Sequence, residues 1–149
     1  MILLEKKELL DDALELYYNQ SFIEHDPISI PHSFEHPRDI EIAGFFAAIF
    51  AWGNRKTIIN KSRDLLERMD NAPFDFVLNA DTSSLNSLHS FKHRTFNGVD
   101  LIGIVQTLQD VYRKFDSLEE AILVKDQKSQ VTIKENLHKL HLLFAQSPF

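Results

Sequence analysis

DIEIAGFFAAIFAWGNR, residues 39–55, is the one stretch of this sequence that is too apolar to lie on a protein surface. Read as an α-helix at about 100° per residue, it has one half of bulky side chains and one half of alanine and glycine. The bulky half consists of Ile42, Phe45, Phe46, Ile49, Phe50 and Trp52. A helix that is apolar all round is buried, so we predict that residues 39–52 form a central helix.

The small half of this helix predicts close packing against a neighbour. It consists of Ala43, Gly44, Ala47, Ala48 and Ala51, which let a second helix approach. Glycine lowers helix propensity, and close contact at Gly44 would explain its presence there. At the start of the helix, Asp39 and Glu41 lie where the helix dipole favours anions.

The composition is typical of one folded domain. The chain has 149 residues, of which 44% are hydrophobic and 26% charged, and twelve are Phe. Such large apolar side chains predict a sizeable core, and we expect residues 1–149 to form a single all-α domain. Because the sequence has no cysteine, disulfides, thiolate nucleophiles and cysteine zinc sites are excluded.

The sequence predicts a cytoplasmic protein without a membrane partner. The N-terminus is charged from Glu5 onward and lacks a long apolar core, so it is not typical of a signal peptide. The apolar part of residues 39–55 is shorter than the ~20 residues needed to cross a bilayer. The formal net charge of -6 argues against nonspecific nucleic-acid binding over the whole surface, although it allows a local basic patch.

Helical spacing predicts amphipathic helices on both sides of the central one. The first runs from about Leu3 to Asn19, and one buried stripe is expected to contain Leu10, Ala13, Leu14, Tyr17 and Tyr18. Asn54 is a favourable N-cap for a second helix over residues 55–69. Its buried stripe is expected to contain Ile58, Ile59, Leu65, Leu66 and Met69, and Asp64 with Arg68 forms an i, i+4 pair.

The remaining segments complete an all-α prediction. We predict a short helix over residues 73–78 and a regular amphipathic helix over residues 100–115. Capping boxes at Ser117 and Thr132 predict two more helices. Residues 21–37 contain three prolines and predict an extended connector, whereas residues 91–98, FKHRTFNG, predict an irregular segment that ends in a turn. No run alternates well enough for a strand. We therefore predict an all-α, multi-helix domain of about six to eight helices.

Three motifs occur in order: FIEHDPISIPHSF at residues 22–34, DIEIAGFFAAIFAWGNRKTIINK at residues 39–61, and HRTFNGVDL at residues 93–101. Together they resemble a family of conserved, uncharacterised bacterial proteins, and the resemblance extends to about residue 145. Members continue well beyond this C-terminus, so the resemblance implies that this chain is the N-terminal part of a longer protein. More distantly, the family is similar to helix-hairpin-helix DNA glycosylases. No position here matches their hairpin or catalytic aspartate, so no catalytic residue is implied.

A first candidate site is the basic cluster at the start of the 55–69 helix. It contains Asn54, Arg55, Lys56, Lys61 and Arg63, and no acid occurs before Asp64. Free backbone amides at this helix end would add to the attraction of a phosphate. A solvated helix face, partly balanced by Asp64 and Glu67, explains the same residues.

A second candidate site is the segment of Lys92, His93 and Arg94, which Phe91 and Phe96 flank. Cations beside aromatic rings suit phosphate contact and base stacking. The alternative is a loop that its two phenylalanines anchor, with Arg94 donating hydrogen bonds to backbone carbonyls.

Two groups of histidines predict no site. Glu24, His25, Asp26, His32 and His36 are potential metal ligands, but their spacing matches no structural zinc pattern, and we predict no metal. His138 and His141 lack the acid of an H-E-x-x-H motif, and we expect a partly buried histidine there. The sequence contains no phosphate loop, nucleophile elbow or dinucleotide fingerprint, so no cofactor is predicted.

Two functions from different classes are consistent with these features. The first is a nucleic-acid-associated, glycosylase-like helical module without the catalytic part. The second is a helical interaction or scaffolding domain without chemistry of its own. The apolar residues Phe144, Pro148 and Phe149 at the C-terminus further predict an exposed patch through which the chain forms a homodimer.

Overall fold

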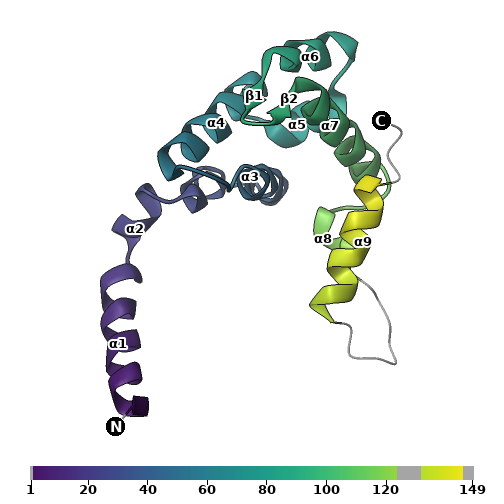
Figure 1. Ribbon diagram of the computed structural model, residues 1–149. Coiled ribbons are helices and arrows are strands. Elements are labelled where there is room, and N and C mark those ends of the chain that lie inside the picture. The colour runs from purple at the N-terminus through teal and green to yellow at the C-terminus, as the bar shows by residue number, and fades with distance from the viewer. Residues whose placement is uncertain (1, 124–131, 146–149) are drawn as a thin grey trace.

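The computed structural model describes residues 2–123 and 132–145, and this part of the chain is mostly helical. Figure 1 shows an arch of helices, with α1 projecting from one end, α8 and α9 at the other, and α3 between them. The elements are α1 (Ile2–Tyr17), α2 (Gln20–Glu24), η1 (Pro27–Ser29), η2 (Pro31–Ser33), α3 (Pro37–Ile49), α4 (Arg55–Arg68), α5 (Pro73–Asn79), α6 (Thr82–Ser87), η3 (Leu88–Ser90), β1 (Lys92–His93), β2 (Phe96–Asn97), α7 (Gly98–Tyr112), α8 (Leu118–Ile122) and α9 (Ile133–Ala145). The predicted all-α architecture is confirmed.

The central helix of the prediction is α3, and it occupies the core. Ile42, Phe46 and Phe50 are fully buried among side chains of α4, α5 and α7. The helix ends at Ile49 rather than at Trp52, because the chain turns at Gly53, whose φ is +112°. The placement of Trp52 on the buried face is therefore wrong, since its side chain is 45% exposed.

The small half of α3 packs on α4 and on the turns before α3. Ala43 and Ala47 lie in a second core cluster with Ile30, Ile59 and Leu66. Gly44, however, is not required by close packing. A Cβ at this position would lie 3.7 Å from the Pro31 side chain, which is an ordinary van der Waals distance.

Glu41 ties α3 to α7 and α8, a role that the dipole argument missed. Its carboxylate accepts hydrogen bonds from the backbone N–H groups of Leu118 at 2.7 Å and Glu119 at 2.8 Å, and from the Tyr112 hydroxyl. It thereby supplies acceptors for the amides at the start of α8. Burial, together with the hydrogen bond to Glu41, raises the pKa of the Tyr112 hydroxyl well above its usual value.

Two predictions for irregular segments are wrong. Residues 21–37 are not an extended connector but contain α2, η1 and η2, because Asn19 and Asp26 cap short helical turns. Residues 91–98 form an antiparallel two-stranded sheet, in which His93 pairs with Phe96. Asn97 does not form a turn but caps α7 in a capping box with Asp100.

The first helix forms as predicted, but its apolar stripe is not buried. Leu10 is 68% exposed, Leu14 58% and Tyr18 85%. The ring of Tyr17 contacts Phe22 of α2 at 5.8 Å between centroids, and α1 otherwise projects from the arch (Figure 1). Helical spacing thus placed these apolar side chains on one stripe, but it did not predict that most of the stripe is exposed.

The last described helix packs on the core through Leu140, Leu143 and Phe144. The Phe144 ring stacks on Phe45 at 5.3 Å, so Phe144 does not contribute to an exposed patch. Pro148 and Phe149, the other members of the predicted patch, lie outside the described residues. His138 and His141 are both exposed, so the expected partly buried histidine is wrong. No helix of the described part is long and apolar enough to span a bilayer.

Candidate functional site

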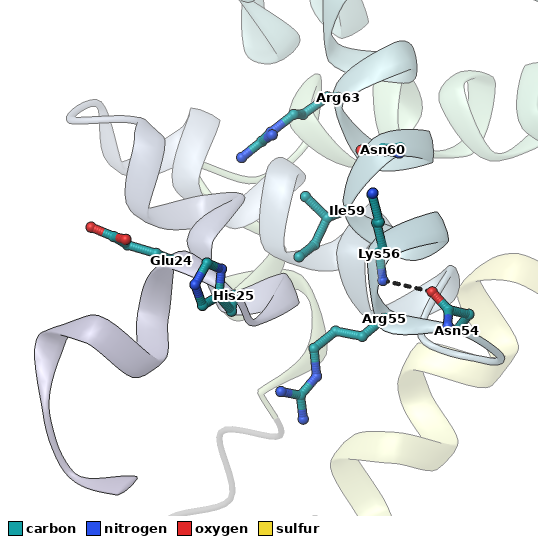
Figure 2. Close-up of a pocket in the computed structure, with 8 residues that line it drawn as sticks. All are labelled: Glu24, His25, Asn54, Arg55, Lys56, Ile59, Asn60 and Arg63. Atoms are coloured by element: carbon teal, nitrogen blue, oxygen red, sulfur yellow. Dashed lines mark hydrogen bonds between the residues drawn. The ribbon is translucent and has the colours of Figure 1, made fainter.

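The basic start of α4 borders an open groove with a volume of about 510 Å³. Figure 2 shows its side chains, which come from α2 and α4 and from the residues beside them. Arg63 reaches from α4 toward α2, whereas the Glu24 carboxylate points away from the other side chains. The lining residues are Glu24, His25, Asn54, Arg55, Lys56, Ile59, Asn60 and Arg63.

Asn54 is the N-cap of α4, as predicted. Its side-chain oxygen accepts hydrogen bonds from the backbone N–H groups of Lys56 at 3.0 Å and Thr57 at 3.4 Å. The Ile58 N–H donates to the Asn54 carbonyl. The amides of Lys56 and Thr57 are therefore already bonded within the protein, and side chains must supply most of the attraction for a phosphate.

Two of the predicted cations are engaged by acids. Arg55 Nε lies 3.8 Å from Asp26 Oδ2, and its guanidinium lies over the Phe22 ring. Lys61 Nζ donates to Asp64 Oδ2 at 2.8 Å and lies over the Phe91 ring, outside the groove. Arg55 and Lys61 are therefore engaged by contacts within the protein.

Asp64 joins Lys61 to Arg68, as the i, i+4 spacing predicted. Arg68 Nε donates to Asp64 Oδ1 at 2.9 Å. Burial by itself would raise the pKa of Asp64, but the hydrogen bonds from Lys61 and Arg68 and their charges outweigh it and lower the pKa. This carboxylate is therefore ionised at neutral pH and offsets one of the two positive charges of Lys61 and Arg68.

Lys56 and Arg63 remain available to a ligand. Both are exposed, and neither forms an ion pair within the part of the chain that the structure describes. They lie on one helix, seven residues apart, so both side chains project from the same face of α4. Asn60 lies between them and adds a hydrogen-bonding amide to the lining.

The second candidate segment is divided between core and surface. Lys92 is exposed, whereas His93 is only 2% exposed and its Nε2 lies 3.2 Å from the Phe50 carbonyl oxygen. Burial lowers the pKa of His93, and the charges of Arg94 and Lys61 lower it further. The hydrogen bond to Phe50 raises this pKa but does not outweigh them. The neutral ring donates that hydrogen bond and anchors β1 to the end of α3.

Arg94 brings this segment to the start of α4. Its guanidinium carbon lies 5.3 Å from the centroid of the Trp52 ring and directly against Gly53, one residue before the Asn54 cap. A Cβ at Gly53 would lie 2.6 Å from that carbon. Candidate residues about forty positions apart in the sequence thus meet at one loop.

Several residues of this region were not predicted as site residues, among them Glu24 and Ile59 of the groove lining. Trp52 was placed in the core, while His25 and Asn60 were not assigned to the groove. The Gly53-Asn54 helix break could have indicated that Trp52 lies outside the core, because a side chain next to such a break need not follow the buried face of the helix. No sequence signal places His25 beside α4.

The histidine-rich connector has structural contacts instead of a ligand cluster. Asp26 accepts from the Ile28 N–H at 3.0 Å, and His36 stacks on Phe74 with its Nδ1 3.9 Å from Asp39. No three potential metal ligands gather in the described ranges, which include Glu24, His25 and His32.

Comparison with known proteins gives one finding. The sequence model of a family described as "Protein of unknown function (DUF2400)" matches residues 26–148. The match begins after α2 and includes α3, α4, the β1–β2 hairpin and α7. No curated protein and no solved structure matches the chain.

Proposed function

Because this chain belongs to a family of proteins of unknown function, DUF2400, its function has to be inferred from its own surface, and we propose that it is a nucleic-acid-binding helical module. Its groove between α2 and α4 would hold the phosphate backbone. The proposal assigns binding to this chain and assigns no reaction to it.

The observation that carries this proposal is the pair of unpaired cations on the groove. Lys56 and Arg63 line an open hollow on the same helix face, and neither forms an ion pair with an acid of the described residues. Arg94 adds a third exposed cation beside Gly53. Lysine and arginine side chains grouped in this way are the usual contacts to phosphate groups.

The distribution of acids makes binding compatible with a net charge of -6. Five acids lie on α1, namely Glu5, Glu8, Asp11, Asp12 and Glu15. This helix projects away from the body of the arch (Figure 1). Charges on an exposed helix are screened beyond roughly 8–10 Å at physiological salt, so they oppose binding in the groove only weakly.

The resemblance to helix-hairpin-helix DNA glycosylases supports the same ligand class. Those proteins are all-α and bind DNA. The resemblance does not extend to a catalytic residue, because their hairpin and aspartate match no position of this chain. A binding module is therefore the function that both the groove and the resemblance support.

Neutralising two groove cations is expected to reduce both the affinity for DNA and its salt dependence. In Lys56→Gln with Arg63→Gln, two of three phosphate contacts are lost. Because the log-log salt slope is about -0.7 per contact for single strands, it should change from about -2 to about -0.7. For duplex DNA, at about -0.9 per contact, it should change from about -2.7 to about -0.9. Fluorescence anisotropy of labelled oligonucleotides at several salt concentrations measures both slopes.

The matched control is Lys114→Gln with Lys134→Gln, which removes the same charge from two exposed positions, one in the turn after α7 and one on α9. It should leave the affinity and slope within about twofold of the unsubstituted chain. Equal losses in both double variants would show that only net charge matters. Unchanged binding in the groove variant would rule out this groove as the phosphate site.

A second candidate function, an interaction domain, is favoured by the uncovered face of α1. Its exposed apolar side chains are Leu4, Leu9, Leu10, Leu14, Leu16, Tyr17 and Tyr18. We propose that the α1 helices of two copies pair in antiparallel orientation. The N-terminal half of α1 has no net charge, because Glu5 and Glu8 balance Lys6 and Lys7, whereas Asp11, Asp12 and Glu15 make its C-terminal half acidic. Antiparallel pairing therefore keeps the two acidic halves apart and buries one self-complementary face.

Self-association should depend on the apolar face of α1. Light scattering over a dilution series is expected to give twice the chain mass of 17.3 kDa at high concentration. Leu10→Glu with Leu14→Glu should give monomers, because it places charges in the pairing face. The control, Gln106→Glu with Lys114→Gln, adds the same negative charge outside α1 and should still dimerise. A monomer at all concentrations would contradict the proposal.

A further inference from the structure

We infer that Trp52 is a stacking platform for an unpaired nucleobase, which makes single-stranded nucleic acid the ligand class of this site. This inference rests on the proposed function, because the groove cations would hold the phosphates of the same strand. It concerns a residue that neither the sequence motifs nor the groove lining assigns to binding.

The exposure of Trp52 is the first observation. The side chain is 45% exposed, whereas Phe46 and Phe50 of the preceding helix are completely buried. It is excluded from both apolar clusters of the described core. A large aromatic ring on the surface beside basic side chains is the combination that single-strand binding proteins use.

The second observation is the way in which Arg94 is held against this ring. Arg94 has a φ of +56°, a left-handed conformation that is unfavourable for a residue with a side chain. Its guanidinium lies 5.3 Å from the centroid of the Trp52 ring. The guanidinium can lie there because residue 53 is glycine, since a Cβ at this position would lie 2.6 Å from the guanidinium carbon and Arg94 would have to move.

The ring itself is positioned by buried neighbours. The Trp52 ring is nearly perpendicular to the His93 ring, at 88° and with 6.3 Å between the ring centroids, and His93 is fixed in turn by its hydrogen bond to the Phe50 carbonyl oxygen. The indole is therefore supported from the core side while almost half of its surface is open. A rigid, supported ring loses little conformational entropy when a base stacks on it.

The location of the platform relative to the groove decides the class of nucleic acid. Trp52 is followed directly by Gly53 and by Asn54, Arg55 and Lys56, which border the groove. A strand with one base on Trp52 would place a neighbouring phosphate toward Arg94 or Lys56. Bases inside a duplex are paired and stacked on one another, so they offer no free face to the indole.

The test uses the fact that Trp52 is the only tryptophan of the chain. Its intrinsic fluorescence is titrated with an unlabelled thymidine oligonucleotide of about 12 nucleotides, with an abasic oligomer of equal length, and with a duplex. Stacking should quench the fluorescence with the thymidine strand only. The abasic oligomer has the same phosphates and should bind more weakly without quenching.

Substitutions give a second readout by anisotropy of a labelled strand. Trp52→Ala should weaken single-strand binding by about 5- to 150-fold, while Trp52→Phe keeps a ring and should stay within a few-fold of the unsubstituted chain. Duplex affinity should not change in either variant. If Trp52→Ala does not fold, the quenching titration and Trp52→Phe still decide the question.

Failure of this inference and of the proposed function can be told apart. One outcome would overturn the stacking platform alone. In it, binding depends on salt and is lost in Lys56→Gln with Arg63→Gln, but the fluorescence is not quenched and Trp52→Ala binds like the unsubstituted chain. Absence of binding to every oligonucleotide would overturn both. Equal quenching by the abasic oligomer would also overturn stacking, because no base is present to stack.

Discussion

Replacing Phe46 by Asp is expected to prevent the chain from folding. Phe46 is 1% exposed and packs against Phe45 at 5.7 Å and Phe50 at 6.1 Å between ring centroids. Loss of the ring removes about 3–5 kcal/mol of packing, and an unpaired carboxylate in this core adds a desolvation cost of several kcal/mol. Their sum is comparable to the ~5–15 kcal/mol that stabilises a typical domain. Circular dichroism should show no cooperative thermal transition.

The control for this substitution is Glu67→Gln on the exposed face of α4. Surface substitutions of this kind change stability by about 0.5 kcal/mol or less, so the variant should melt like the unsubstituted chain. A soluble Phe46→Asp variant with a cooperative transition would show that α3 is not the centre of the core.

Replacing Gly98 by Ala is expected to produce the second largest loss of stability. Gly98 is the first residue of α7 and is buried against η3. A Cβ there would lie 2.5 Å from the Leu88 carbonyl oxygen and 2.5 Å from the His89 Cα. Because these are backbone atoms, relief requires η3 to move, and we expect a loss of about 3 kcal/mol. The melting temperature should fall by roughly 6–12 °C.

Gly44→Ala is the matched control, since it makes the same chemical change inside α3. A Cβ at Gly44 has only ordinary contacts with Pro31, at 3.7 and 3.9 Å. Alanine favours the helix by about 0.5–1 kcal/mol over glycine, so this variant should melt slightly higher than the unsubstituted chain. Equal effects of the two substitutions would contradict the packing described for η3 and α7.

Local sequence signals were sufficient for the longer helices and for some of the caps, such as Asn54 and Ser117. Asn54 caps α4, Asp64 pairs with Arg68, and the five residues of the predicted α4 stripe are buried. Each of these features depends on residues within one or two turns of a helix, where spacing alone determines which side chains meet. The all-α class follows from the same local periodicity.

The candidate site was predicted in part for the same reason. The basic residues at the start of α4 were recognised from their clustering in the sequence, and Lys56 and Arg63 indeed line one groove. The pairing of Lys61 with Asp64 follows from their i, i+3 spacing, whereas the contact of Lys61 with the Phe91 ring was not predictable, because Phe91 comes from a distant segment. Whether a cation is free to bind a phosphate depends on the acids and rings that contact it in the folded protein.

By itself, the sequence determined which residues share a helical face and where several helices begin, among them α4 and α5. Only the tertiary structure decided which faces are covered: α1 keeps its apolar stripe exposed, Trp52 lies outside the core, and His93 lies inside it. The physical reason is that periodicity describes neighbours about four residues apart, whereas burial depends on segments that approach from far along the chain. Arg94 reaches Gly53, and Glu41 reaches Leu118, only because α3, α4 and α7 pack into one core.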